Sequence, residues 1–279
     1  MKKIFVAFFV FAFAVLALIS CDKVEEPYLT VIGHEGPGPG EKIRKVLLED
    51  YTGHKCPNCP EGAAMAKSLK TLYGDKLVLL TVHAGYYADP EASGLFTADF
   101  RTSEGSAWNS QFSVQAYPTG MVNRIPYQNK RVLFIDSWEA AVAALVDLPQ
   151  QAELTIANSY DADTRDLECR VDTKFLENLD GIYNLCVVLA ESGIIAPQQS
   201  DTGVITDYVH NHVLRASLNG AWGELVGADG TAEINDQNQN EYSFDLDPEW
   251  NASNCVVIAF VYNTSTYEIV QAEEEPVAK

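Results

Sequence analysis

Two cysteines separated by two residues stand between an apolar segment and an alanine-rich one. The sequence at 56–59 is CPNC, preceded by IRKVLLEDY at 43–51 and followed by AAMAKSLKTLY at 63–73. The first pattern predicts a buried strand and the second a helix with one apolar face. Residues three apart on a helix have Cβ atoms about 5–6 Å apart, and a disulfide needs Cα atoms about 4.4–6.8 Å apart. The pair is therefore a redox couple, half of a metal site or a structural disulfide, and the compartment bears on the choice.

The N-terminus has the composition of an export signal that ends in a lipid-attachment site. Residues 1–3 are MKK, 4–18 are apolar, and 18–21 read Leu-Ile-Ser-Cys. An apolar run of 15 residues is shorter than the ~20 that cross a bilayer, so we expect a cleaved signal peptide over 1–20. Its end resembles a bacterial lipobox, which implies lipidation of Cys21 and anchoring by its acyl chains. An ordinary secretory signal with an incidental cysteine is the alternative.

The chain is strongly acidic. Its formal net charge is -20, and loss of Lys2 and Lys3 with the signal takes it to about -22. We therefore expect no binding to nucleic acid, and contact with the membrane only through lipid at Cys21. The acid-, proline- and glycine-rich stretch 21–42 predicts a flexible tether; it also resembles the surface-export signals of Bacteroidetes-type lipoproteins. Export implies an oxidising compartment, in which disulfides persist.

The rest of the chain changes character at about residue 150. Strand and helix patterns alternate over 43–150, with a weakly periodic stretch at about 86–107 that we interpret as an insertion. Over 151–279, short alternating segments are separated by turns, which is typical of an antiparallel sandwich. We predict an α/β domain followed by an immunoglobulin-like β-sandwich.

Cys56 is the expected nucleophile of the pair. If the helix starts at Cys56, with Pro57 at its first helical position, the positive end of the helix dipole favours the thiolate. The neighbouring Lys55 adds a positive charge. Cys59 would then resolve the mixed disulfide.

The segment resembles the thioredoxin superfamily through three elements in one order. Asp50 lies six residues before Cys56, where thioredoxins keep a buried acid that assists proton transfer to the second cysteine. The stretch FSVQAYPT at 112–119 is similar to the family's cis-proline segment, which implies a cis Tyr117-Pro118 bond opposite the cysteines. The resemblance implies a thioredoxin-like fold for 43–150 and catalytic roles for Cys56, Cys59, Asp50 and Pro118.

Two other interpretations of the pair bear on its function. A zinc site needs two more ligands, and although His54 and His83 are near, no second C-x-x-C exists, so we expect no zinc. A structural disulfide on a redox-inactive thioredoxin-like fold is the stronger alternative. The sequence departs from thioredoxin at Lys55, where tryptophan is usual, and at the central Pro-Asn dipeptide, which is usually Gly-Pro.

Two segments of the C-terminal half contain metal-ligand residue types. His210 and His212 lie two apart in YVHNHVLR at 208–215, and on a strand they would share a face. No third ligand accompanies them, so we expect a packed strand. The loop at 227–241 has acids near glycine but lacks the full calcium-loop pattern. We predict no metal and no cofactor.

Three further cysteines lie in the C-terminal half: Cys169, Cys186 and Cys255. In an immunoglobulin-like order they would lie on strands B, C and F, so a bridge between Cys169 and Cys255 is conceivable. We expect instead three buried free thiols that pack as small apolar side chains.

The lipobox, CPNCPEG at 56–62, AYPTGMVNR at 116–124 and YVHNHVLR at 208–215 together extend over nearly the whole mature chain. They resemble the Bacteroidetes outer-membrane lipoprotein family named after a 28-kilodalton outer-membrane protein. The resemblance implies a thioredoxin-like domain, a β-rich domain and a lipid anchor in the outer membrane, facing the periplasm or the cell surface. It implies no defined biochemical role.

Two functional hypotheses follow. The first is an envelope thiol–disulfide oxidoreductase acting on exported proteins, and a partly exposed Cys56 opposite Pro118 would favour it. The second is a non-catalytic binding or scaffolding lipoprotein in which Cys56 and Cys59 form a structural disulfide. An insertion at 86–107 that covers Cys56 would favour the second.

Overall fold

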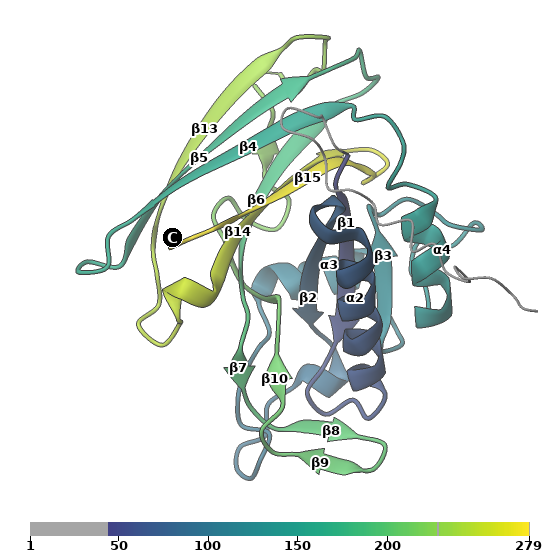
Figure 1. Cartoon of the computed structure of the whole chain (residues 1–279), viewed down its shortest axis with the longest axis vertical. Coiled ribbons are helices and arrows are strands. Elements are labelled where there is room, and N and C mark those ends of the chain that lie inside the picture. Colours follow the sequence, from purple (N-terminus) through teal and green to yellow (C-terminus); the bar gives the residue numbers. More distant parts are fainter. Residues whose placement is uncertain (1–43, 228, 279) are drawn as a thin grey trace, which may run out of the picture. The chain divides into compact units, whose positions relative to one another are not determined.

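The computed structural model describes residues 44–227 and 229–278 (Figure 1). The expected signal peptide, the lipidated Cys21 and the tether at 21–42 lie outside the described residues. Among the helices that the structure describes, none has the length and apolar character to cross a membrane. The coarse expectation of a mixed α/β chain, rich in sheet and with few helices, is confirmed.

The largest sheet has eight strands. Seven follow one another in the order β15-β14-β6-β11-β2-β1-β3, and β12 pairs with β6 outside this path. The bounds of these strands are β1 Val46–Thr52, β2 Leu77–His83, β3 Thr119–Val122, β6 Tyr183–Glu191, β11 Val213–Ser217, β12 Glu224–Leu225, β14 Cys255–Asn263 and β15 Ile269–Pro276.

The α/β part is built around β1, whose seven residues are all buried. It runs parallel to β2 and antiparallel to β3. The crossover to β2 is α2 (Cys59–Tyr73), which buries one face formed by Cys59, Gly62, Ala66, Leu69 and Tyr73. This spacing of three and four residues is that of an amphipathic helix. The short α4 (Trp138–Ala143) packs with α2 against β1 and β3.

Helix α3 (Ser103–Gln111) begins at Ser103 because Thr102 caps it: the Thr102 side chain accepts a hydrogen bond from Gly105 N at 2.9 Å. The predicted insertion at 86–107 therefore contains most of α3. The remaining short helical turns are η1 Gly74–Lys76, η2 Tyr86–Ala88, η3 Ile135–Ser137 and η4 Ala252–Asn254.

One sheet contains strands from both sides of residue 150. Strand β11 is parallel to β2 through Val213 and Thr81, and Thr81 N donates to His212 O at 2.7 Å. The sheet of the α/β part thus continues into β6, β14 and β15. The division into domains at about 150 stays a prediction, but the two parts are not separate sheets.

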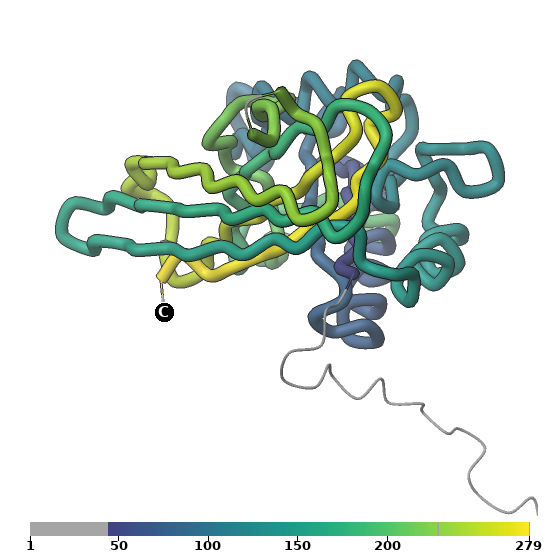
Figure 2. The backbone as a smooth tube through the Cα atoms, turned by 90° about the horizontal axis from the view of Figure 1, so that it is seen from above, coloured from purple at the N-terminus to yellow at the C-terminus, as the bar shows by residue number. Residues whose placement is uncertain are grey.

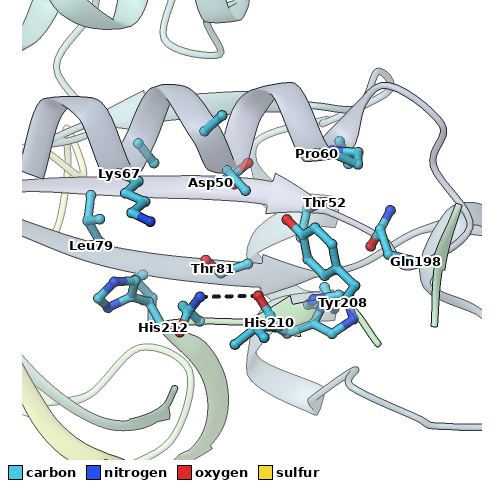
Figure 3. Close-up of a pocket in the computed structure, with 18 of the residues that line it drawn as sticks. Asp50, Thr52, Pro60, Lys67, Leu79, Thr81, Gln198, Tyr208, His210 and His212 are labelled. Carbon is cyan, nitrogen blue, oxygen red and sulfur yellow. Dashed lines mark hydrogen bonds between the residues drawn. The ribbon is translucent and has the colours of Figure 1, made fainter. Parts of the chain in front are cut away.

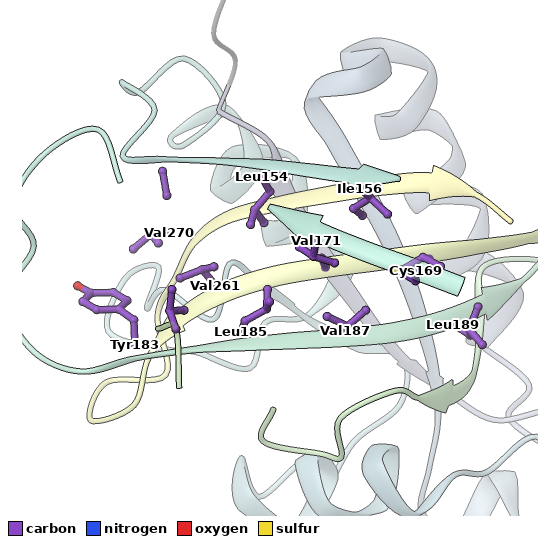
Figure 4. Close-up of a cluster of buried hydrophobic side chains, with 14 of the residues drawn as sticks. Leu154, Ile156, Cys169, Val171, Tyr183, Leu185, Val187, Leu189, Val261 and Val270 are labelled. Carbon is purple, nitrogen blue, oxygen red and sulfur yellow. The ribbon is translucent and has the colours of Figure 1, made fainter. Parts of the chain in front are cut away.

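A second sheet has three strands in the order β13-β5-β4. These are β4 Ala152–Tyr160, β5 Asp166–Phe175 and β13 Gln237–Asp245, and Figure 2 shows them running together, coloured teal and light green. Alternate residues of β5, such as Cys169 and Val171, face a core shared with β6 and β14 (Figure 4). The C-terminal half is therefore antiparallel and two-layered where these sheets face each other.

Two small hairpin-like pairs connect β6 to β11. Strand β7 (Ile194–Ile195) pairs with β10 (Val209–His210), and β8 (Gln198–Ser200) pairs with β9 (Gly203–Ile205). We call residues 194–210 the arm. Figure 1 shows the arm as a green extension at the end of the molecule where β1 runs into α2.

Candidate functional site

The two cysteines of the C-x-x-C form a disulfide in the turn between β1 and α2. Their Cα atoms are 5.4 Å apart. The expectation that the helix starts at Cys56 is wrong: α2 starts at Cys59, after Asn58, and Pro60 lies in its first turn. Proline is tolerated there because the first amides of a helix lack intrahelical acceptors. Cys56 is held one turn earlier, where Cys59 N donates to its carbonyl oxygen at 3.3 Å.

Asp50 is a buried acid on β1. The residue is 3% exposed, and its Oδ1 has no hydrogen-bond partner among the described residues. Burial raises its pKa from 3.8 to about 7. Asp50 and Cys59 line the same cavity. The carboxyl group is thus able to hold or release a proton near neutral pH in the cavity that Cys59 lines.

Pro118 packs against the first turns of α2. The Tyr117-Pro118 peptide bond is cis, as the sequence predicted. A Cβ atom added to Gly62 would lie 2.9 Å from the Pro118 Cβ, so glycine is needed for this close approach. The Tyr117 hydroxyl donates to Asn109 Oδ1 at 2.6 Å. The structure thus brings Pro118 to the helix that contains Cys59.

Cys56 is covered. It is only 1% exposed. The arm contributes to this cover, because the Gln198 side-chain amide donates to Cys56 O at 3.0 Å and to Gly53 O at 3.3 Å. The backbone also contributes, since Gln199 N donates to His54 O at 2.7 Å. The partly exposed Cys56 that would have favoured exchange is not found.

The predicted insertion covers only part of the loop. Lys55 N donates to Tyr87 O at 3.0 Å, and Gly53 lies against the backbone of Tyr87 and Ala88. The arm was not anticipated, because nothing in the sequence of Gln198 and Gln199 signals contact with a loop about 140 residues earlier.

A cavity of about 570 Å³ opens beside Cys59 (Figure 3). One wall is α2, with Pro60 and Lys67, and the floor is formed by β1 and β2. The opposite wall is the end of the arm and the residues after it, 208–212. In Figure 3 the Tyr208 side chain points from the arm toward β1. Cys59 is among the lining residues and Cys56 is not.

Three histidines lie close together, and two of them, His83 and His210, line this cavity. His83 lies 5.5 Å from His210 and 6.4 Å from His54 between ring centroids, with Phe100 5.0 Å from His83. Burial lowers the pKa of His83 well below 6.5, with smaller contributions from His210 and His54, and lowers that of His210 to about 4. These imidazoles are neutral at pH 7. Within the described ranges, no group of three or more histidine, cysteine or acidic residues is arranged to hold a metal ion.

The predicted strand over 208–215 is interrupted. His210 ends β10, and His212 has a φ of 55°, so the alternation expected for a continuous strand is lost. Both histidines nevertheless line the cavity. Sequence reasoning placed them together but did not place them beside Cys59.

The three cysteines of the C-terminal half are free and buried, as expected. Burial raises the pKa of each of Cys169, Cys186 and Cys255 to about 12. The conceivable bridge between Cys169 and Cys255 is not formed. These thiols are packed as apolar side chains and are poor nucleophiles.

Comparisons with known proteins add the following. A family profile described as "Outer membrane protein Omp28" matches residues 105–278. HBP35 of Porphyromonas gingivalis is 20% identical with a TM-score of 0.62, covering 86% of this chain and 77% of its own. An Agrobacterium tumefaciens protein is 14% identical with a TM-score of 0.54, covering 86% and 97%. A domain of the outer membrane lipoprotein Omp28 from Porphyromonas gingivalis is 25% identical with a TM-score of 0.33, covering 47% and 92%.

No curated protein matches the chain. The likenesses to HBP35 and to the Agrobacterium protein concern the fold alone. The profile match begins after the C-x-x-C at 56–59, so it says nothing about what these cysteines do.

Proposed function

The chain belongs to the Omp28 family of outer membrane lipoproteins, and from that premise we propose that it performs thiol–disulfide exchange in the cell envelope through Cys56 and Cys59. The observation that carries the proposal is the shared cavity of Cys59 and Asp50, which is lined both by a buried carboxyl group with a pKa of about 7 and by one cysteine of the disulfide. A purely structural disulfide does not need such an acid, whose burial costs stability.

The fold around the pair supports a thioredoxin-like assignment for the α/β part. Strand β1 is parallel to β2 and antiparallel to β3, α2 follows the C-x-x-C, and a cis proline precedes β3. For the C-terminal half, β5 and β14 lie in different sheets, as strands B and F do in an immunoglobulin-like sandwich. We take both assignments as part of the proposal.

In the proposed reaction, the Cys56 thiolate attacks one sulfur of a client disulfide and the other client sulfur leaves as a thiolate. Cys59 then gives its proton to ionised Asp50 and attacks the Cys56 sulfur. This step forms the Cys56–Cys59 bond and releases the second client sulfur. Two electrons pass from the protein to the client. Pro118 is a positioning residue, because it packs on α2 at Gly62.

The test is the reduction potential of the pair in the mature protein. Catalytic pairs have potentials of roughly -270 to -120 mV, whereas structural disulfides of exported proteins lie below about -300 mV. We expect a value in the higher range after equilibration with glutathione buffers at pH 7. A value below about -300 mV would contradict the proposal.

The burial of Cys56 favours a second candidate function. A cysteine that is 1% exposed cannot meet the disulfide of a folded protein in this conformation. In that case the chain is a non-catalytic binding or scaffolding lipoprotein stabilised by the disulfide. Resistance of the pair to reduction until the chain unfolds would select this candidate. Exported protein clients, expected from the sequence, would reach Cys56 only with the arm displaced.

A further inference from the structure

We propose that the exchange partner of the closed protein is a low-molecular-weight thiol bearing a carboxylate, which reaches the disulfide through the cavity at Cys59. This inference rests on the proposed function and names its substrate class. Three features carry it: the cover over Cys56, the cavity beside Cys59, and the charge of the residues that line this cavity.

The cover excludes large partners from Cys56. Gln198 is 2% exposed and donates hydrogen bonds to Cys56 O, Gly53 O and Gln199 O. These bonds join the arm to the loop that carries the cysteines. A protein thiol would have to displace the arm, and would leave these buried carbonyl groups without a donor, at a cost for each lost hydrogen bond.

The cavity gives a small molecule another route. It has a volume of about 570 Å³, and its lining includes Cys59, Pro60 and Gln198. Small-molecule sites in proteins typically have about 300–1,000 Å³. Cys59 is itself only 2% exposed, but it lines this space and Cys56 does not, so a thiolate that enters the cavity meets Cys59.

The charges of the lining favour an anionic molecule. Lys67 is the one lysine or arginine among the described residues that line the cavity, and Figure 3 shows it extending from α2 toward β2. It lies eight residues after Cys59, which is about 12 Å along a helix. His83 and His210 are neutral, and Asp50 is half protonated near pH 7. A thiol that reacts at Cys59 can therefore place a carboxylate near Lys67.

The chemistry balances with thiol as the only co-reactant. The incoming thiolate forms a bond to the Cys59 sulfur, the Cys56–Cys59 bond breaks, and Cys56 leaves as a thiolate. A second thiolate attacks the non-protein sulfur of this mixed disulfide, which releases the small disulfide and Cys59. Protonated Asp50 can supply the proton to Cys59. Two small thiols are oxidised to one disulfide, and the protein gains two thiols.

The experiment measures second-order rate constants for reduction of the native mature chain. The small probes are 3-mercaptopropionate and cysteamine, which have similar size and opposite charge, and the large probe is a thiol-terminated polyethylene glycol. Each rate is divided by the rate for an unstructured peptide with the same CPNC disulfide, which removes differences in intrinsic reactivity. We expect the normalised rate of 3-mercaptopropionate to be at least about tenfold higher than that of the large thiol. We expect it to be about threefold higher than that of cysteamine.

Two variants test the two structural features separately. Gln198→Ala should lower the ratio of small to large thiol rates at least about fivefold. Gln199→Ala should leave the ratio unchanged, because the Gln199 side chain donates to Ser200 O within the arm and not to the cysteine loop. Lys67→Met, at an exposed position, should remove the preference for the anionic probe.

The outcomes separate this inference from the proposed function. If the large thiol reduces the pair as readily as the small ones after normalisation, the inference is overturned while exchange stands. If cysteamine equals 3-mercaptopropionate, the carboxylate preference is overturned. If no thiol reduces the pair before the chain unfolds, the proposed function fails and the inference fails with it.

Discussion

Glu49 and Asp50 are neighbours on β1 that face opposite sides of the sheet, and among the described residues only Glu49 has a cationic partner. The Arg124 guanidinium donates to both Glu49 carboxylate oxygens at 2.7 and 2.9 Å, and both side chains are fully buried. Asp50 lies on the α2 side, beside the cavity, without such a partner. Strand alternation thus separates an acid that is paired with an arginine from one whose pKa is raised to about 7 by burial.

Asp50→Asn should remove a loss of folding stability that grows as pH rises. Between pH 3.8 and about 7 the unfolded chain releases the Asp50 proton and the folded chain keeps it, so stability falls as pH rises through this window. At 1.36 kcal/mol per unit the total is about 4 kcal/mol. We expect the variant to gain stability relative to the parent by up to that amount between pH 4 and 8, measured by urea unfolding. The exposed Asp75→Asn is the control, and parallel pH profiles for parent and Asp50→Asn would contradict the expectation.

Arg124→Met should be strongly destabilising. Arg124 lies within 5.0–5.1 Å of the rings of Trp108, Phe112 and Phe260, and its loss leaves Glu49 buried without a counter-charge. Removing one partner of a buried ion pair costs about 3–5 kcal/mol. Thermal or urea unfolding at pH 7 measures this cost. Arg170→Met, in the exposed pair with Asp172, should cost less than about 1 kcal/mol.

A second substitution separates the charge from the packing. Adding Glu49→Gln to Arg124→Met removes the uncompensated carboxylate, so the double variant should recover part of the lost stability. If the double variant is less stable than Arg124→Met, the cation–π contacts and packing of Arg124 account for the cost and the ion pair does not.

Local sequence patterns predicted the parts of the site that are close in the chain. Strand β1, the C-x-x-C turn, Asp50 and the cis bond before Pro118 are set by contiguous or motif-level signals, and they are found as expected. The start of α2 was misplaced by three residues, because Pro57 and Pro60 each suit a first helical turn.

The parts that were missed depend on contacts between distant segments. Gln198 reaches Cys56 across 142 residues, and Arg124 reaches Glu49 across 75. Neither glutamine nor arginine carries a periodic signal that identifies such a partner. The pairing of β2 with β11 is equally non-local, and it joins two segments that composition alone separated at residue 150.

Cys21→Ser tests the lipid anchor that the sequence predicts outside the described residues. A serine cannot accept the acyl chains through a thioether, so the precursor should stay uncleaved or the body should be released in soluble form. The measurement is metabolic labelling with a fatty acid, followed by membrane fractionation. The lipobox interpretation fails if the variant still incorporates label and stays on the membrane.

His210→Phe should protect the fold against acid. Burial lowers the pKa of His210 from 6.5 to about 4, so its contribution to stability is complete above pH 6.5 and is lost as pH falls toward 4. In this pH range His210 takes up a proton in the unfolded chain but not in the folded chain. The resulting loss in the free energy of unfolding is about 3 kcal/mol. Phenylalanine keeps a ring against His83 and Phe100, which lie 5.5 and 5.0 Å from His210, and does not titrate.

The pH dependence of stability is compared between the parent and His210→Phe. Asp50 stabilises the fold as pH falls through the same range, which opposes the effect of His210, but its contribution is the same in both proteins and cancels in the difference. Urea unfolding at pH 7 and pH 4.5 should show that the parent loses about 2–3 kcal/mol more than His210→Phe on acidification. Tyr208→Phe is the matched control, since Tyr208 packs 4.8 Å from His210 but does not titrate in acid. If His210→Phe loses as much stability on acidification as the parent and the control do, the packing of His210 against His83 and Phe100 does not suppress its protonation in the folded state.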